Sequence, residues 1–204
     1  MEKEHEGHKD QKQMWMKFAG MIATSTLVMF ILMHQMVYES DHLTFSLNRF
    51  IASLVSGSSM VIIMLGFMWS MYRDPALKKM VMVGAAIAFV GLLFVNRQQV
   101  LIGDEGYMRS MIPHHSIAIN NSRKATITDP RVRKLADAII EAQMKEIAEM
   151  KLLLEDIEVN GEMGSGEALP PRTAELTPEL LEEAKKAVER PVTPELLEEV
   201  ETGT

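Results

Sequence analysis

Four side chains that could bind a metal ion lie close together in this sequence. The segment Tyr107–Ile119, YMRSMIPHHSIAI, contains Met108, Met111, His114 and His115. If the segment is helical, Met108, Met111 and His115 share one face and His114 lies about a quarter turn away. Thioether sulfur binds Cu(I) or Ag(I) well and zinc or iron poorly, whereas imidazole binds both oxidation states of copper. This combination therefore predicts copper or silver before zinc.

Two helices are needed to position these residues. One is predicted from about Glu105 to Ala125. The sequence Asp129-Pro130 is a typical helix start, with an N-cap and a proline in the first turn, and Asn160-Gly161 is a typical end. The result is an antiparallel helical hairpin within residues 98–158.

Polar residues interrupt the apolar face of the second helix. That face reads Val132, Leu135, Ile139, Gln143, Glu146, Met150 and Leu153. A buried carboxylate is costly unless it is paired or binds a metal. Folding the hairpin about its turn places Met111 level with Glu146, His115 with Gln143, and Met108 with Met150, within about one turn.

The predicted metal site combines ligands from both helices. Its members are Met108, Met111, His114, His115, Gln143, Glu146 and Met150. Gln143 and Glu146 have two possible roles: they could bind Cu(II) directly, or they could orient a histidine from outside the ligand shell. The structural alternative is that the histidines are hydrogen-bonded at a kink made by Pro113 and that the methionines only fill the hairpin core.

The motifs of several enzyme classes are absent. The hairpin has no Glu-x-x-His pair for a diiron site, and the sequence has no His-Glu-x-x-His zinc protease motif. It also lacks a recognisable serine or cysteine nucleophile arrangement and contains no cysteine for thiolate metal sites. We therefore expect a binding protein and not an enzyme.

Three stretches before the hairpin are long and apolar. Residues 18–38, 50–72 and 80–96 contain no Asp, Glu, Lys or Arg. Because about 20 apolar residues span a bilayer, they predict three transmembrane helices within residues 18–97 and direct contact with membrane lipid.

Basic residues predict the orientation of these helices. Lysines are frequent in the arm 1–17, and the loop 73–79 carries three basic residues, whereas the loop 39–49 carries only Arg49. The positive-inside rule places the arm and the loop 73–79 in the cytoplasm of a bacterial inner membrane. The hairpin and everything after it are then extracytoplasmic.

The last segment of the chain is acidic. The net charge of −7 equals the balance of 11 acidic and four basic residues within 159–204. A repeat with Pro-Glu-Leu-Leu-Glu-Glu after Thr177 and Thr193 marks two short helix starts in an otherwise disordered linker and tail. No basic patch indicates nucleic-acid binding.

Methionines also recur inside the membrane segments. The chain has 18 of them. Helical stripes occur at Met29, Met33 and Met36 and at Met60, Met64, Met68 and Met71. Such stripes are typical of packing, and a path for soft cations is the alternative. His34 and His42 lie near the outer end of the first span, where we expect them at the membrane interface and would test them in metal movement.

The hairpin resembles a known family. The run Met-Ile-Pro-His-His-Ser-Ile-Ala-Ile from Met111, the run Asp-Pro-Arg-Val-Arg-Lys-Leu-Ala-Asp-Ala-Ile-Ile from Asp129, and Gln-Met-Lys-Glu-Ile-Ala-Glu-Met from Gln143 are similar to the bacterial family called domain of unknown function 305. The similarity spans residues 104–157, and three preceding spans resemble its membrane-anchored subgroup. The resemblance implies a ferritin-like fold and extracytoplasmic copper or silver binding. It supports Met111, His114, His115, Glu146 and Met150 as site residues.

Together these patterns predict an all-α protein in which three transmembrane helices precede a ferritin-like hairpin. Because two helices bury little surface, we expect hairpins from two copies to form a four-helix bundle, as a homodimer. The predicted function is binding of Cu(I) or Ag(I) for buffering, delivery or tolerance, with Cu(II) left open. The alternatives are a metal-free interaction protein whose acidic tail recruits a partner, and a transporter subunit that uses the methionine stripes.

Overall fold

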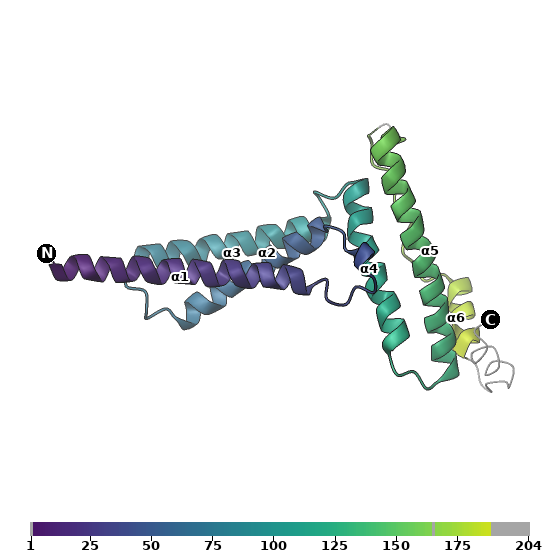
Figure 1. Cartoon of the computed structure of the whole chain (residues 1–204), viewed down its shortest axis with the longest axis horizontal. Helices are drawn as coiled ribbons and strands as arrows, with labels where there is room; N and C mark the ends of the chain where they lie inside the picture. Colours follow the sequence, from purple (N-terminus) through teal and green to yellow (C-terminus); the bar gives the residue numbers. More distant parts are fainter. Residues whose placement is uncertain (1, 165, 189–204) are drawn as a thin grey trace. The chain divides into compact units, whose positions relative to one another are not determined.

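The computed structural model describes residues 2–164 and 166–188 of the chain (Figure 1). In this part every regular element is a helix, which confirms the all-α prediction. The helices are α1 (Glu2–Leu32), the 3₁₀ turn η1 (Ser40–His42), α2 (Leu47–Phe67), α3 (Pro75–Gln98), α4 (Asp104–Lys124), α5 (Pro130–Asn160) and α6 (Pro178–Val188).

Three of these helices are long and apolar enough to span a membrane. The segments are Lys9–Leu32 within α1, Leu47–Phe67 and Pro75–Gln98. They overlap the three predicted spans, but their ends differ from the limits of the uncharged stretches. The absence of charged residues defines the limits of an apolar stretch, whereas local hydrogen bonds decide where a helix begins and ends.

The end of α1 illustrates this difference. The helix stops at Leu32, before the predicted limit of residue 38. The chain then makes turns with shorter spacing, in which the His34 N–H donates to the Ile31 carbonyl at 3.0 Å. The Met33 carbonyl accepts a hydrogen bond from the Arg49 guanidinium. A cation at a helix C-terminus satisfies a carbonyl that has no helical partner.

Side-chain caps set the starts of α2 and α3. The Ser46 hydroxyl accepts from the Arg49 N–H at 3.3 Å. The Asp74 carboxylate accepts from the N–H groups of Ala76 and Leu77 at 2.9 and 3.0 Å, with Pro75 in the first turn. The third helix therefore begins several residues before the predicted residue 80, and α2 ends at Phe67 instead of 72.

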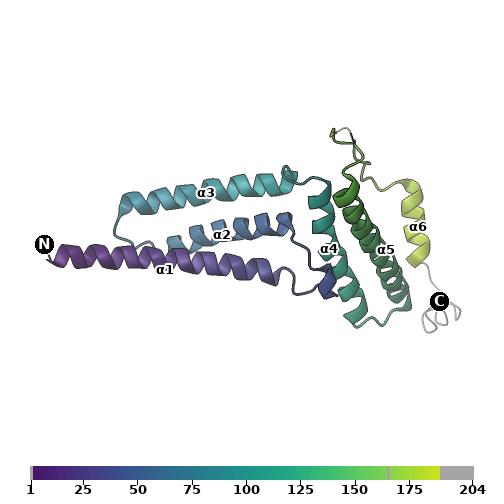
Figure 2. The ribbon, with the colours of Figure 1, turned by 45° about the horizontal axis from the view of Figure 1, so that its top comes forward.

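The three apolar helices pack through α2, which lies between α1 and α3 (Figure 2). Phe18, Leu65 and Tyr72 form a buried cluster, and the Trp15 ring lies 4.3 Å from the Tyr72 ring between centroids. Gly57 allows α1 to approach α2, since a Cβ there would lie 2.5 Å from Thr26 Oγ1. Small residues at helix contacts are typical of membrane bundles. A cavity of about 860 Å³, lined almost entirely by apolar groups, lies among these helices.

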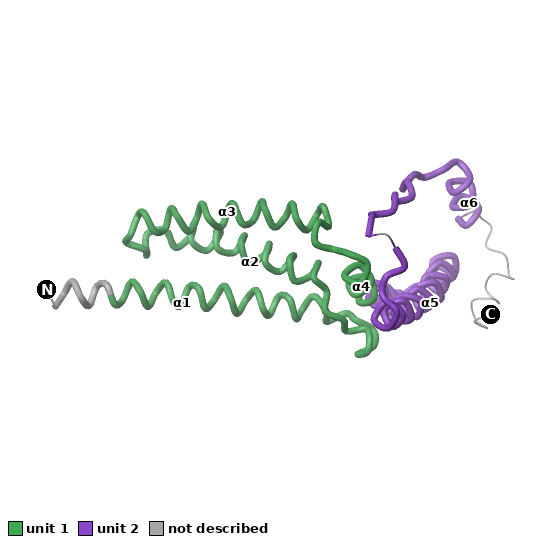
Figure 3. The backbone as a smooth tube through the Cα atoms, turned by 90° about the horizontal axis from the view of Figure 1, so that it is seen from above, with its two compact units in different colours: residues 1–113 green, residues 114–204 purple. Residues whose placement is uncertain are grey.

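The chain divides into two compact units, Met1–Pro113 and His114–Thr204 (Figure 3). The boundary falls inside α4, between Pro113 and His114. Proline removes one helical hydrogen bond and leaves the Arg109 carbonyl without its partner at position 113. The Thr44 hydroxyl donates to that carbonyl, so the missing bond is replaced within the first unit.

In the second unit α5 begins and ends as predicted. The Asp129 carboxylate accepts from the Arg131 N–H at 2.9 Å, and Gly161 follows the last helical residue with φ of 79°. The Arg133 guanidinium donates to the Ser122 carbonyl at 3.0 Å and joins α5 to the end of α4.

The prediction of which side of α5 faces the core was wrong. The buried residues are Ala136, Ile147 and Met150, whereas Leu135 and Leu153 are 62% and 52% exposed. The helix is therefore turned so that Ile147 packs inward and the predicted stripe lies along one edge.

The first copy of the acidic repeat forms α6. Its start is capped by Thr177, whose hydroxyl accepts from the Leu180 N–H at 3.3 Å. The Arg131 guanidinium donates to the Val188 carbonyl at 2.9 Å, which joins α6 to the beginning of α5. The helix start predicted at Thr177 is thus present as α6, and this contact adds to its local helix propensity. The second copy lies outside the described residues.

Candidate metal site in the second unit

His115 is the centre of the candidate site. Its residue surface is only 9% exposed, and its Nε2 lies 2.8 Å from Glu146 Oε2. His115 belongs to α4 and Glu146 to α5, so the contact joins the two helices. A carboxylate at this distance accepts a hydrogen bond from the ring nitrogen.

This bond selects the tautomer of the histidine. In the tautomer that makes this bond, the proton lies on Nε2. Histidines that bind metals commonly donate their other ring N–H to a carboxylate, which fixes the ring and raises its basicity. His115 has one such carboxylate partner in Glu146.

Gln143 holds the carboxylate in place. Its amide Nε2 donates to Glu146 Oε2 at 3.1 Å, from one turn earlier on α5. Gln143 and Glu146 therefore act on each other and on His115. Of the two roles predicted for them, orientation of the histidine fits these contacts, because Glu146 Oε2 accepts from both the His115 ring and the Gln143 amide.

Methionines precede His115 and follow Glu146 along the sequence of the two helices. Met150 follows Glu146 by one turn on α5 and is 8% exposed. On α4, Met111 and Met108 precede His115 by one and two turns, and Met108 is 5% exposed. These two methionines belong to the first unit, and Met150 belongs to the second.

His114 differs from its neighbour. It is exposed, and its ring centroid lies 5.9 Å from that of His115 at an interplanar angle of 68°. The successive residues of a helix point in different directions, so the exposed ring does not share the His115 environment. His115 was predicted to lie level with Gln143, to within about one helical turn. It contacts Glu146 instead, which is three residues further along α5 and therefore within that margin.

The turn before α5 contains a strongly paired carboxylate. Asp129 Oδ2 lies 2.6 Å from Arg131 Nη2, and its other oxygen accepts from the same guanidinium. Side-chain hydrogen bonding from Arg131, then the backbone hydrogen bond, lowers the pKa of Asp129 to about 2.

A second group of candidate ligands lies in the first unit. Among the described residues, Glu39, Asp41 and His42 bring their ligating atoms within 4.8 Å of one another. The sequence drew attention to His42 alone. The spacing of Glu39, Asp41 and His42 within four residues, directly after an apolar stretch, was the pattern that could have indicated the whole group.

Comparisons with known proteins found similarity over part of the chain. An uncharacterized protein, L153, of Acanthamoeba polyphaga mimivirus is 40% identical over 67 residues, which cover 32% of this chain and 44% of that protein. The match thus spans less than half the length of this relative. No solved structure matches the chain significantly. Residues 104–200 match the family described as Domain of unknown function (DUF305), and this match supports assigning that part of the chain to the domain family.

Proposed function

We propose that this protein is a membrane-anchored binding protein for Cu(I) or Ag(I), which takes the metal at α4 and α5 for buffering, delivery or tolerance. The observation that carries the proposal is the buried His115, whose Nε2 is held 2.8 Å from Glu146. Met150 is buried one turn beyond that carboxylate. A fixed imidazole beside buried thioether sulfur is a donor set for a soft cation.

Each residue then has a role. His115 supplies a nitrogen donor and Met150 a sulfur donor, and Met108 and Met111 join this set on the sequence pattern alone. Gln143 and Glu146 orient the imidazole. The carboxylate also offsets the cost of placing a cation among buried groups. His114 is exposed and is suited to exchange of the metal with solvent or a carrier.

The membrane segments support an anchored location. Three helices have the required length and apolarity. By the positive-inside rule, the basic residues of the arm 1–17 and the loop 73–79 favour a cytoplasmic location for those segments, with α4 and α5 outside. A phosphatase fused after Gly103 should therefore be active outside the cytoplasm. An inactive fusion would reverse the orientation.

A second copy of the chain would complete the helical domain. Leu135 and Leu153 leave an apolar edge exposed on α5, at 62% and 52% of their surfaces. Pairing two copies would cover this edge and produce a four-helix bundle. Light scattering in detergent should give the mass of a dimer at micromolar protein, and a monomer there would contradict the pairing.

A competitive Cu(I) titration of the full chain in detergent tests the metal proposal. The variant Met111→Leu/His115→Ala/Met150→Leu should lose binding. The control variant Met60→Leu/Met64→Leu/Met68→Leu changes three methionines of the membrane helices and should retain it. Equal binding by both variants would reject the site, and loss only in the control would favour the methionine stripes of the transporter alternative.

A further inference from the structure

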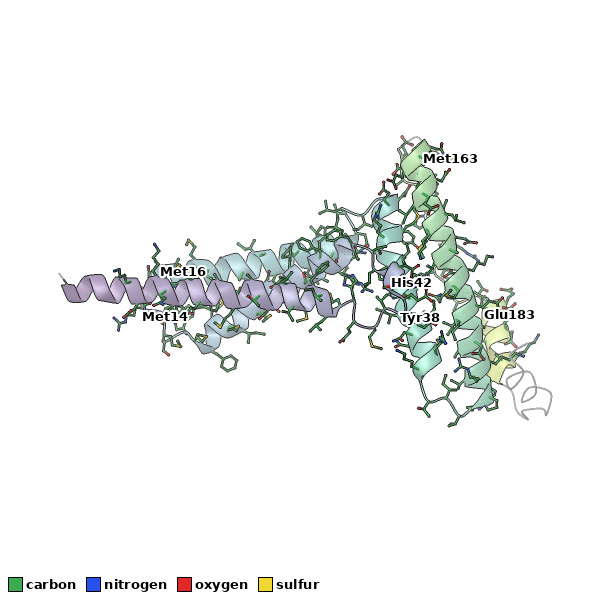
Figure 4. All side chains as sticks on the ribbon, in the orientation of Figure 1. Met14, Met16, Tyr38, His42, Met163 and Glu183 are labelled. Carbon is green, nitrogen blue, oxygen red and sulfur yellow. The ribbon has the colours of Figure 1, made fainter. Side chains whose placement is uncertain are left out.

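The segment between α1 and α2 gathers three potential ligands of a different kind. Glu39, Asp41 and His42 lie on or beside η1, and Figure 4 labels His42 there. The His42 side chain is 3% exposed, whereas those of Glu39 and Asp41 are 48% and 63% exposed. A buried imidazole therefore faces two carboxylates that remain open to solvent.

The distances within this group fit ligands that share one ion. His42 Nε2 lies 3.7 Å from Asp41 Oδ1 and 3.9 Å from Glu39 Oε2. Direct hydrogen bonds between such atoms measure about 2.7–3.2 Å. Ligands of one tetrahedral zinc ion, bound at about 2.0–2.2 Å, lie roughly 3.3–3.6 Å apart. The carboxylates thus approach the same ring nitrogen with nearly the separation that a shared cation requires.

The backbone holds the three residues in this arrangement. The His42 N–H donates to the Glu39 carbonyl and the Leu43 N–H to the Ser40 carbonyl, each at 3.1 Å. The Thr44 N–H donates to the His42 carbonyl at 3.1 Å. A turn fixed by its own hydrogen bonds reduces the entropy that ligand ordering would cost.

We propose that Glu39, Asp41 and His42 bind one divalent cation of the zinc and cobalt class. Two carboxylate oxygens and one imidazole nitrogen suit such a cation and disfavour Cu(I) and Ag(I). The two negative charges offset the charge of the ion, and three protein ligands leave a position for water, as in open zinc sites. The donor set contains no thioether, so this site does not rest on the proposed function of the second unit.

Cobalt titration of the full chain in detergent tests the proposal, since the visible absorption of Co²⁺ reports its coordination. The parent protein carries His114→Ala and His115→Ala, which removes the other pair of adjacent imidazoles. We expect one equivalent of Co²⁺ to bind with the absorption of a bound, partly protein-ligated ion. Glu39→Gln/Asp41→Asn should weaken this binding by roughly tenfold or more, because even partners outside the ligand shell cost about 10–100-fold.

The control makes the same chemical change at two exposed carboxylates of α5, Glu155→Gln/Asp156→Asn, and should leave the titration unchanged. Circular dichroism melting confirms that each variant is folded, and the single change Asp41→Asn replaces the pair if the double variant unfolds. Unchanged binding in the Glu39 and Asp41 variants, equal loss in the control, or no binding by the parent would each overturn the proposal. Cu(I) binding by the protein with intact histidines is measured separately, and these carboxylate changes should not alter it.

Discussion

Two buried histidines, His42 in the first unit and His115 in the second, show how carboxylates can serve an imidazole in two ways. The Nε2 of His115 lies 2.8 Å from the Glu146 carboxylate, within hydrogen-bond distance. His42 has two carboxylates, at 3.7 and 3.9 Å from the same ring atom. The first distance is that of a hydrogen bond, and the second two are longer and close to the separation of ligands that share one ion.

The two imidazole rings also differ in the types of side chain around them. The buried Met150 follows Glu146 by one turn on α5, whereas the carboxylates of Glu39 and Asp41 beside His42 are exposed. On ligand softness we therefore expect a soft monovalent cation in the first environment and a divalent cation in the second. The comparison teaches that two histidines of similar burial can be suited to different metals through their neighbours.

Removal of the His115 ring is expected to have the largest effect. His115→Ala deletes a donor and leaves Glu146 without the ring, so the Cu(I) affinity should fall by roughly a hundredfold or more, the upper end of second-shell effects. Competition with a chromophoric chelator measures the change. The neighbouring change His114→Ala is the control, and an equal loss there would show that the two histidines are equivalent.

Loss of the orienting carboxylate is expected to have an intermediate effect. Glu146→Gln keeps the shape but removes the charge that fixes the tautomer of His115, and it should weaken Cu(I) by roughly 10–100-fold. Glu149→Gln changes an exposed carboxylate one turn away on the same helix and should be neutral. Failure to bind any metal at all would instead make Glu146 a direct ligand.

Replacement of one methionine should affect the binding of a soft metal at the second unit and leave the binding of a divalent metal at the first unit unchanged. Met150→Leu removes a thioether from the second unit while keeping an apolar side chain of similar size. We expect Ag(I) affinity to fall and Co²⁺ binding at Glu39, Asp41 and His42 to stay unchanged. Parallel titrations with the two ions measure both effects, and a fall in Co²⁺ affinity would show that the two sites are not independent.

The smallest expected effect concerns Asp129, a third carboxylate, which pairs directly with a cation. Its pKa in the folded chain is about 2, below the ordinary value of 3.8. Its contribution to stability is therefore fully present above pH 3.8 and is lost as the pH falls through about 2. Asp129→Asn should lower the melting temperature at neutral pH. The difference from the parent should shrink between pH 4 and pH 2, and a difference independent of pH would contradict the ion pair.

Local patterns were sufficient to predict much of the fold. The uncharged stretches located three apolar helices, and Asp129-Pro130 and Gly161 located the ends of α5, because these features depend on neighbouring residues only. The rotation of α5 was not predictable, since Leu135 and Leu153 are as apolar as Ile147 and only packing distinguishes them.

The geometry of the two candidate sites could not be predicted either, because it also depends on how distant residues pack. Residue types indicated that His115 and Glu146 belong to one region, but their bond requires the register of two helices. The approach of Glu39 and Asp41 to His42 requires the turn at η1. The hydroxyl of Thr44, which satisfies the carbonyl opened by Pro113, is far away in sequence and could be assigned only from the structure.

The central claim is that the second unit binds a soft metal through sulfur and nitrogen. X-ray absorption of the full chain loaded with one equivalent of Cu(I) tests this directly. The account predicts a shell with both sulfur and nitrogen scatterers, in which the sulfur contribution falls in Met111→Leu/Met150→Leu and the nitrogen contribution falls in His115→Ala. A shell of nitrogen and oxygen alone, unchanged by these substitutions, would contradict it.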